Sequence, residues 1–186
     1  MPAIPIAERF CHELLQQAQS IKVAFLDVDG VLTDGGLYIG ADGEGFKRFH
    51  TLDGHGLKLL RQAGIEPVVI TGRDSAALRH RLAALGIRHA VYGTEQKLPA
   101  AVQMLQVLGL DWEQAAGMGD DWPDLPVLQR CRLAVAPPLA HAEVHHVAHY
   151  VTRAGGGQGA VREFCDLLLM ATGHYGAFLQ QAQFSS

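Results

Sequence analysis

The residues that could do chemistry lie in four short segments, each of which follows an apolar run of strand length. In the first segment, Asp27 and Asp29 stand two residues apart after the run VAFL. Two carboxylates this close repel each other, so they need a cation or a shared proton. A divalent cation with oxygen ligands would supply that charge. Solvated aspartates that cap the next helix would look the same in the sequence.

The second and third segments could hold a phosphate. Thr71, Gly72 and Arg73 follow the run PVVI and offer a hydroxyl, a backbone N–H and a guanidinium. Lys97, near the start of a predicted helix, could neutralise both a phosphate and a carboxylate. Taken singly, each segment has a plainer explanation: a helix cap beside a surface arginine, and a solvated lysine.

The fourth segment again places carboxylates after an apolar run. Asp120 and Asp121 follow Gly119, and Asp124 stands slightly further along the chain. This acidic group could complete the oxygen shell of a magnesium ion that keeps several waters. A turn that leads into a capped helix is the alternative, because Pro123 suits a first helical turn.

The elements that must position these segments are apolar strands that alternate with helical patterns. Such alternation predicts an α/β fold, with a central parallel sheet covered by helices on both faces. The predicted strands are Ile21–Leu26, Ile65–Ile70, His89–Tyr92, Ala115–Met118, Leu133–Ala136 and Ala148–Val151. The predicted helices between them are Leu57–Gln62, Ser75–Leu85, Gln96–Leu108, Pro123–Gln129 and Pro138–His145.

A hairpin and the two ends of the chain lie outside this alternation. Residues 36–50 predict a protruding β-hairpin around a turn rich in glycine and aspartate. A helix over Ile6–Gln19 is expected before the first strand, and residues 159–186 are expected to form a helix and a polar tail. We expect residues 1–186 to form one domain, because the chain is too short for two comfortable ones.

All four chemical segments can converge, because the carboxyl ends of parallel strands lie at one rim of a sheet. Their order, a carboxylate pair, a hydroxyl, a lysine and an acidic pair, resembles the haloacid dehalogenase superfamily of phosphatases. The matching motifs are DVDGVLTDG, ITGR, Lys97 and GDDWPD, and the resemblance covers roughly residues 21–170. It implies a Rossmann-like three-layer sandwich and an Mg²⁺-dependent enzyme.

The resemblance also implies a role for each matching residue. Asp27 would be the nucleophile that forms an aspartyl-phosphate, and Asp29 would be the general acid and base. Thr71 and Lys97 would hold the phosphoryl oxygens. The implied Mg²⁺ ligands are Asp27, Asp29 through its backbone carbonyl and Asp120, with Asp121 and Asp124 around them.

A cap domain, common in this superfamily, has no room in this sequence. Only 18 positions separate Gly35 from Asp53, and the stretch from Thr71 to Lys97 holds one predicted helix and one strand. An open site excludes water poorly. Either a macromolecular substrate or a neighbouring subunit would therefore have to cover it.

A narrower resemblance favours the neighbouring subunit. The hairpin, the segment FHTLDGHGLKLL and the segment YVTRAGGGQGAVREFCDLLL are similar to the family of 3-deoxy-D-manno-octulosonate 8-phosphate phosphatases, which act in lipopolysaccharide synthesis. This similarity implies a small sugar-acid phosphate as substrate and a homotetramer. The residues implied to bind that substrate are Asp29, His50, Thr51, Leu52, Asp53, Gly54, Lys58, Gly72, Arg73, Arg81 and Lys97.

Several positions depart from that family and keep other functions open. Residues 50–54 read His-Thr-Leu-Asp-Gly where the family usually has Asn-Val-Arg-Asp-Gly, and Lys58 and Gln158 stand where arginine is usual. Lysine lacks the bidentate geometry of arginine. A phosphatase for a related nonulosonate 9-phosphate or another small phosphate ester stays open. So does a binding or scaffold subunit that has lost activity.

The composition of the chain limits its expected partners and cellular location. The formal net charge of -4 gives no general attraction for polyanions, so nucleic acid is not an expected partner. No stretch is long enough for a membrane span, and the three cysteines fit neither a disulfide framework nor a zinc site, which predicts a cytoplasmic protein.

We expect an exposed or interfacial face for His141, His145, His146 and His149, and a hinge for a mobile tail at residues 155–157.

Overall fold

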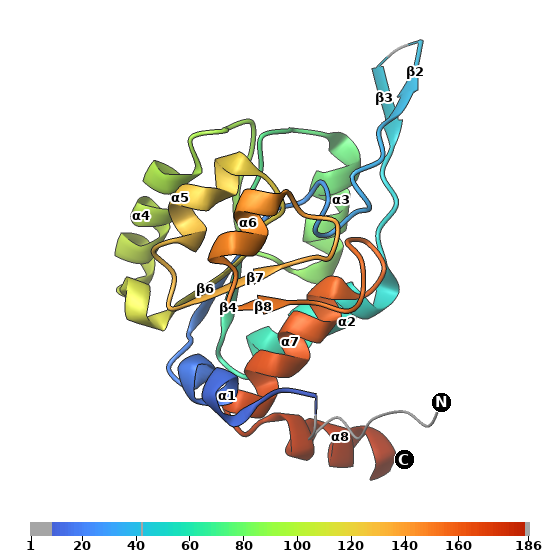
Figure 1. Ribbon diagram of the computed structural model, residues 1–186. Coiled ribbons are helices and arrows are strands. Elements are labelled where there is room, and N and C mark those ends of the chain that lie inside the picture. The colour runs from blue at the N-terminus through green and yellow to red at the C-terminus, as the bar shows by residue number, and fades with distance from the viewer. Residues whose placement is uncertain (1–8, 42, 185–186) are drawn as a thin grey trace.

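A parallel sheet of six strands forms the centre of the molecule (Figure 1). The order of its strands is β5-β4-β1-β6-β7-β8. The computed structural model describes residues 9–41 and 43–184. Its central strands are β1 (Val23–Leu26), β4 (Glu66–Ile70), β5 (His89–Val91), β6 (Ala115–Met118), β7 (Leu133–Ala136) and β8 (Tyr150–Val151). The predicted α/β fold with a parallel sheet is confirmed.

Side chains of each strand alternate between two helical layers, as the period of a strand requires. In β1, Ala24 and Leu26 join one core cluster, while Val23 and Phe25 join the other. Because both faces are covered, the strands are apolar throughout rather than alternating with polar residues. The first layer contains α1 (His12–Ala18), α2 (Thr51–Gln62), α3 (Ala76–Leu85) and α7 (Ala160–Ala171), and the second α4 (Lys97–Leu108), α5 (Leu125–Leu128) and α6 (Ala142–Val147).

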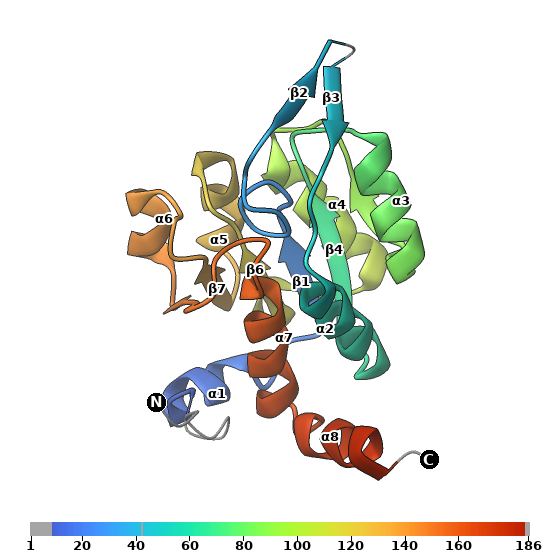
Figure 2. The ribbon, with the colours of Figure 1, turned by 90° about the vertical axis from the view of Figure 1, so that its right-hand side faces the viewer.

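A two-stranded hairpin, β2 (Tyr38–Gly40) and β3 (Gly43–Phe46), is separate from the central sheet. It projects from the end of the molecule at which β1 finishes, as Figure 2 shows, whereas α1 lies near the opposite end. The predicted hairpin is confirmed, and the part of the chain that the structure describes contains no cap domain.

Helix α2 begins at Thr51, earlier than the predicted Leu57. The Nδ1 atom of His50 accepts a hydrogen bond from the N–H of Leu52 at 3.3 Å and so caps the helix. Gly54 and Gly56 weaken the sequence signal, since glycine is a poor helix former. Both are buried, and a Cβ at Gly56 would lie 3.0 Å from the side chain of Cys165 in α7. These glycines therefore let α2 approach its neighbours closely.

The ends of the chain also differ from the prediction. The expected polar tail is wrong for the described residues, because Tyr175–Phe184 form a helix, α8, in which Tyr175 and Phe178 pack against the core. The first helix is shorter than predicted, and the predicted segment from Ile6 to residue 8 lies outside the described residues.

Two predicted helices between strands have shorter helical cores. The predicted helix Pro123–Gln129 is a 3₁₀ turn, Trp122–Asp124, followed by α5. Helix α6 starts only at Ala142, after the two prolines and a cap by the side chain of His141. A second 3₁₀ turn, Trp112–Gln114, precedes β6. None of the described helices is both long and apolar enough to cross a membrane.

Candidate active site

The four chemical segments meet at one rim of the central sheet. They line a pocket with a volume of about 460 Å³, at the carboxyl ends of the parallel strands, where open α/β sheets bind ligands. The residues around this pocket are Asp27, Asp29, Thr71, Gly72, Arg73, Glu95, Lys97, Asp120, Asp121, Pro123 and Asp124.

The loop after β1 turns sharply and carries the first carboxylate pair. The N–H of Asp27 still donates to the carbonyl of Met118 in β6, at 3.1 Å, so Asp27 is held by the sheet. Gly30 then adopts a φ of 90°, and a Cβ there would lie 2.0 Å from Oδ2 of Asp120. Only glycine therefore allows this loop to come close to the carboxylate of Asp120.

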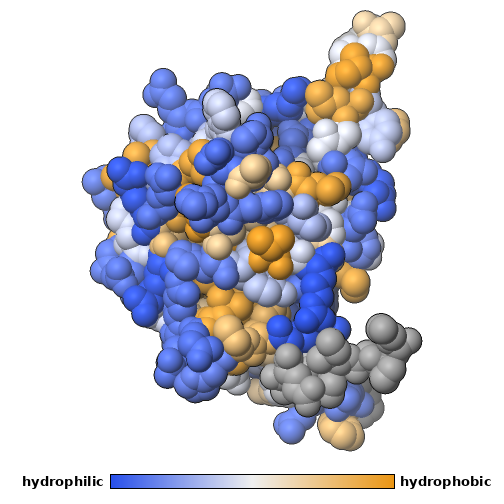
Figure 3. Space-filling view, in the orientation of Figure 1, coloured by the Kyte–Doolittle hydropathy of each residue, from blue (hydrophilic) through white to orange (hydrophobic). Residues whose placement is uncertain are grey.

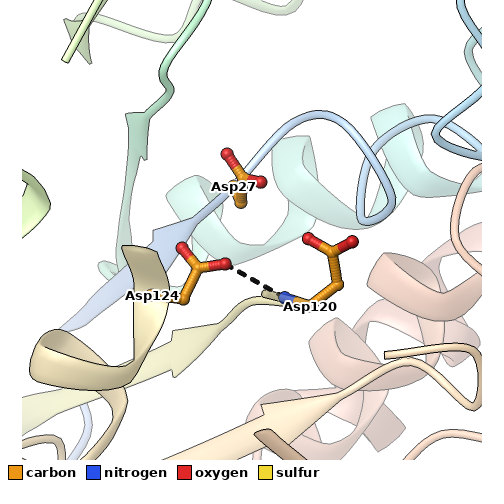
Figure 4. A group of neighbouring side chains, drawn as sticks. All are labelled: Asp27, Asp120 and Asp124. Atoms are coloured by element: carbon orange, nitrogen blue, oxygen red, sulfur yellow. Dashed lines mark hydrogen bonds between the residues drawn. The ribbon is translucent and has the colours of Figure 1, made fainter. Parts of the chain in front are cut away.

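Three carboxylates converge at the bottom of the pocket. One oxygen from each of Asp27, Asp120 and Asp124 lies within 4.8 Å of the others, and Figure 4 shows the three side chains grouped together. Oδ2 of Asp124 accepts a hydrogen bond from the N–H of Asp120 at 3.0 Å, which ties the two residues together. This donor set consists of hard oxygen atoms and fits a divalent cation such as Mg²⁺.

The same cluster carries more negative charge than the protein alone neutralises. Burial, and then the neighbouring carboxylate of Asp124, raise the pKa of Asp27 to about 6. Burial, and then the carboxylate of Asp27, raise the pKa of Asp120 to about 8. Carboxyl groups that hold their protons this strongly favour a bound cation, since the cation stabilises the ionised form.

Lys97 is the buried cation of this cluster. It is the first residue of α4, it is only 5% exposed, and its Nζ lies 2.7 Å from Oδ1 of Asp27 and 2.7 Å from Oδ1 of Asp124. Burial alone would lower the pKa of Lys97, but the carboxylates of Asp27 and Asp124 outweigh it and raise that pKa. Lys97 is therefore a positively charged group at neutral pH beside the candidate nucleophile.

The segment after β4 contributes hydrogen-bond donors to the pocket rather than carboxylates. Thr71 is 1% exposed, and its N–H donates to the carbonyl of Val91 at 3.0 Å, next to β4 in the sheet. Its Oγ1 accepts a hydrogen bond from the N–H of Arg73 at 3.2 Å. Arg73 is half-exposed, and its Nε lies 3.7 Å from Oδ2 of Asp29.

A second set of predicted substrate-binding residues lies elsewhere, around the start of α2. Asp53 is 1% exposed, and its Oδ1 accepts a hydrogen bond from the N–H of Arg162 at 2.8 Å, at the first turn of α7. Arg81 donates to the carbonyl of His50 at 3.3 Å. The side chain of Asp53 is thus buried against the start of α7. None of these predicted residues lines the pocket around Asp27: His50, Thr51, Leu52, Asp53, Gly54, Lys58 and Arg81.

Sequence reasoning missed the role of the glycine run at residues 155–157. The expected hinge is wrong, because the N–H of Gly157 donates to the carbonyl of Val31 at 3.0 Å, and a Cβ at Gly156 would lie 1.8 Å from the carbonyl oxygen of Gly30. Glu163 holds the preceding residues, since it accepts hydrogen bonds from the backbone N–H groups of Arg153 and Ala154. The run is thus a buried support for the loop that carries Asp27 and Asp29.

Sequence reasoning also missed Lys47, which follows β3 at the base of the hairpin. Its Nζ lies 2.5 Å from Oδ1 of Asp29, and its side chain is 2% exposed. A single lysine after a short strand shows no pattern that points to a residue 18 positions earlier. Only the path of the hairpin brings the two together.

Three of the four histidines, His141, His145 and His149, contact nearby backbone or side-chain groups. His141 accepts hydrogen bonds at Nδ1 from Trp122 Nε1, at 3.0 Å, and from the N–H of Glu143, at 3.2 Å. His149 accepts one from the N–H of Ala134 at 2.9 Å, and Nε2 of His145 lies 3.0 Å from the carbonyl oxygen of Pro137. Within residues 9–41 and 43–184, the group of potential metal ligands contains no histidine.

Comparison with known proteins decides the family, although no family model matches the chain. The 3-deoxy-D-manno-octulosonate 8-phosphate phosphatase KdsC of Escherichia coli is 44% identical over 161 residues, which cover 87% of this chain and 86% of that protein. This chain belongs to the 3-deoxy-D-manno-octulosonate 8-phosphate phosphatase family. The predicted resemblance is confirmed at this level.

Two solved structures of this family have the same fold. The Moraxella catarrhalis phosphatase, in complex with a magnesium ion, a phosphate ion and KDO, is 38% identical, with a TM-score of 0.89 over 92% of this chain and 99% of that one. The cobalt-bound phosphatase of Haemophilus influenzae is 40% identical, with a TM-score of 0.87 over 92% of this chain and 100% of that one. Members of the family thus bind divalent metal ions, which agrees with the acidic cluster of this chain.

Proposed function

We propose that this chain is an Mg²⁺-dependent phosphatase that removes the phosphate of 3-deoxy-D-manno-octulosonate 8-phosphate through an intermediate on Asp27. The observation that carries the proposal is the contact of Asp27 with a buried lysine, at 2.7 Å, inside a cluster of three carboxylates. A nucleophilic carboxylate needs this environment, because it must approach an anionic phosphate. Membership of the family supports the choice of 3-deoxy-D-manno-octulosonate 8-phosphate as the substrate.

In the first step, an oxygen of Asp27 attacks phosphorus and forms a new P–O bond. The ester bond between phosphorus and the sugar oxygen breaks, and that oxygen takes a proton from the carboxyl group of Asp29. In the second step, the carboxylate of Asp29 takes a proton from water while the water oxygen attacks phosphorus. The bond to Asp27 then breaks, and inorganic phosphate leaves.

Other residues of the pocket hold the transferring group. Lys97 and Thr71 would bind phosphoryl oxygens, and the N–H groups around Gly72 would add donors. Asp27, Asp120 and the backbone carbonyl of Asp29 would hold Mg²⁺, which supplies positive charge against the equatorial oxygens of the transition state.

Both carboxylate oxygens of Asp124 accept hydrogen bonds within this arrangement. Oδ1 accepts from Nζ of Lys97 at 2.7 Å, and Oδ2 accepts from the N–H groups of Asp120, at 3.0 Å, and Asp121, at 3.3 Å. Both oxygens are thereby engaged with the protein. We propose that Asp124 orients the lysine and the metal-binding loop rather than the substrate itself.

Self-association, as a homotetramer, is the second part of the proposal. The projecting hairpin exposes apolar side chains, and Figure 3 shows this apolar surface at its outer end. Exposed apolar groups on a projection are costly in water, and a second copy of the chain would cover them. The exposed residues are Leu37, Tyr38, Ile39 and Phe46. Light scattering tests this part, and a monomer at micromolar concentration would refute it.

The substrate is tested by phosphate release from a panel of phosphate esters. We expect the highest kcat/KM for 3-deoxy-D-manno-octulosonate 8-phosphate, a requirement for Mg²⁺, and no turnover by Asp27→Asn. A higher kcat/KM for a nonulosonate 9-phosphate would move the substrate to that class. Folded protein without turnover of any ester, with either Mg²⁺ or Mn²⁺, would support a binding or scaffold role instead.

A further inference from the structure

The base of the hairpin delivers a buried cation to the candidate acid and base. Lys47 directly follows β3, and its ammonium lies 2.5 Å from Oδ1 of Asp29. The next residue, Arg48, points elsewhere, since it is half-exposed and pairs with Asp34 at 3.2 Å. The two neighbouring cations thus have different carboxylate partners, and Lys47 is the one that contacts Asp29, a residue of the pocket lining.

The carboxylate of Asp29 is held from three separate parts of the chain. Lys47 comes from the hairpin, Arg73 from the loop after β4 at 3.7 Å, and Thr33 Oγ1 from the same loop as Asp29 at 3.4 Å. The contact with Lys47 is the shortest of the three, and the Lys47 side chain is 2% exposed. It is therefore the contact that most restricts rotation of the Asp29 side chain.

The balance of charge also separates this side of the pocket from the metal side. On the metal side, three carboxylates face the single ammonium of Lys97. Asp29, by contrast, has two cationic partners, Lys47 and Arg73. The exposed Glu95 also lines the pocket, but water screens its charge. A divalent cation would therefore be drawn to the metal side, and the carboxyl of Asp29 would stay directed toward its protein partners.

We propose that Lys47 is a positioning residue for the reaction: from the base of the hairpin, it fixes the carboxyl group of Asp29 where it can protonate the leaving oxygen. This inference rests on the role of Asp29 in the proposed function. It gives the hairpin a part in the chemistry of its own chain, in addition to any part in self-association. An orientation error of about 1 Å in a catalytic group can reduce a rate on the order of 100-fold.

The test compares two leaving groups. A sugar alkoxide needs a proton to leave, whereas p-nitrophenolate does not. The ratio kcat/KM covers the steps up to release of the alcohol, so the later role of Asp29 as a base does not enter. Lys47→Met should lower kcat/KM about 10- to 100-fold for the sugar phosphate, within the range typical of general acid catalysis, and much less for p-nitrophenyl phosphate.

Three further variants sharpen the comparison. Lys47→Arg, which keeps the charge, should retain most of the activity. Arg48→Met is the matched control, and it should leave kcat/KM unchanged for both substrates. Lys47→Met added to Asp29→Asn should cause little further loss, because Lys47 acts through Asp29. Lys47→Gln takes the place of Lys47→Met if thermal melting shows that the methionine variant does not fold.

The inference would be overturned if Lys47→Met lowered kcat/KM equally for both leaving groups or for neither. It would also be overturned if Lys47→Met caused its full loss of kcat/KM when added to Asp29→Asn. Failure of the proposed substrate is distinguishable from this outcome. If the wild-type chain does not hydrolyse the sugar acid phosphate, any other alkyl phosphate that it does hydrolyse serves for the same comparison with p-nitrophenyl phosphate.

Discussion

Replacing Gly156 by alanine should disable the site although this residue does not line the pocket. The added Cβ would lie 1.8 Å from the carbonyl oxygen of Gly30 and 2.8 Å from that of Thr33. Carbon and oxygen atoms that are not bonded need roughly 3.3 Å, even in their closest favourable contacts, so the backbone must move by about 1.5 Å. Both neighbours are backbone atoms of the loop that carries Asp27 and Asp29, so no flexible side chain can give way.

A shift of that size in the nucleophile loop should reduce kcat/KM about 100-fold or more. Overpacking typically costs about 1–3 kcal/mol, which for a chain of this size lowers Tm by roughly 2–12 °C. Steady-state hydrolysis of p-nitrophenyl phosphate at saturating Mg²⁺ and a thermal melt measure the two effects. Gly155→Ala is the matched control, because a Cβ there would lie 3.4 Å from the flexible side chain of Gln158. Wild-type kcat/KM in Gly156→Ala would refute the reasoning.

Three more predictions follow from the buried charges. Lys97→Met should lower kcat about 100- to 1,000-fold, as for the loss of one preorganised charged donor, and a loss below tenfold would contradict its role. Glu163→Ala should lower the free energy of unfolding, measured by urea denaturation, by at least about 1–3 kcal/mol. The reason is that the backbone N–H groups of Arg153 and Ala154 lose their hydrogen-bond acceptor; an unchanged midpoint of the urea transition would count against this. The pKa values of about 6 for Asp27 and about 8 for Asp120 exceed their ordinary value of 3.8, so the metal-free fold binds protons more tightly than the unfolded chain. Their contribution to the stability of the metal-free fold should therefore be fully present below about pH 4 and be lost as pH rises through about 6 and about 8. Mg²⁺ should accordingly raise Tm more at pH 8 than at pH 5; an equal Mg²⁺ effect at both would contradict this.

The rim of the sheet could be predicted from the sequence because its residues follow strands directly. Asp27 stands one position after β1, and Thr71 one position after β4, so strand order alone brings them to the same edge. Lys97 needed only a predicted helix start after β5. Local periodicity and the rules of parallel sheets carry this information.

The supports of the rim could not be predicted, because they depend on distant pairings. Lys47 reaches Asp29 only through the course of the hairpin, and Asp53 is buried because α7 begins against it. A run of glycines has the same sequence in a free hinge and in a buried support, so residues 155–157 carried no signal for their contact with Gly30. Such contacts are decided by tertiary packing rather than by any local preference.

The most direct test of the central claim is to capture the phosphoryl group on Asp27. The wild-type chain is mixed with Mg²⁺ and 3-deoxy-D-manno-octulosonate 8-phosphate, stopped with acid within the first turnover, digested and analysed by mass spectrometry. We expect the peptide that contains Asp27 to be heavier by one phosphoryl group, and this species to disappear at the rate at which phosphate is released. Release of phosphate with no labelled peptide, or a label on another residue, would contradict Asp27 as the nucleophile.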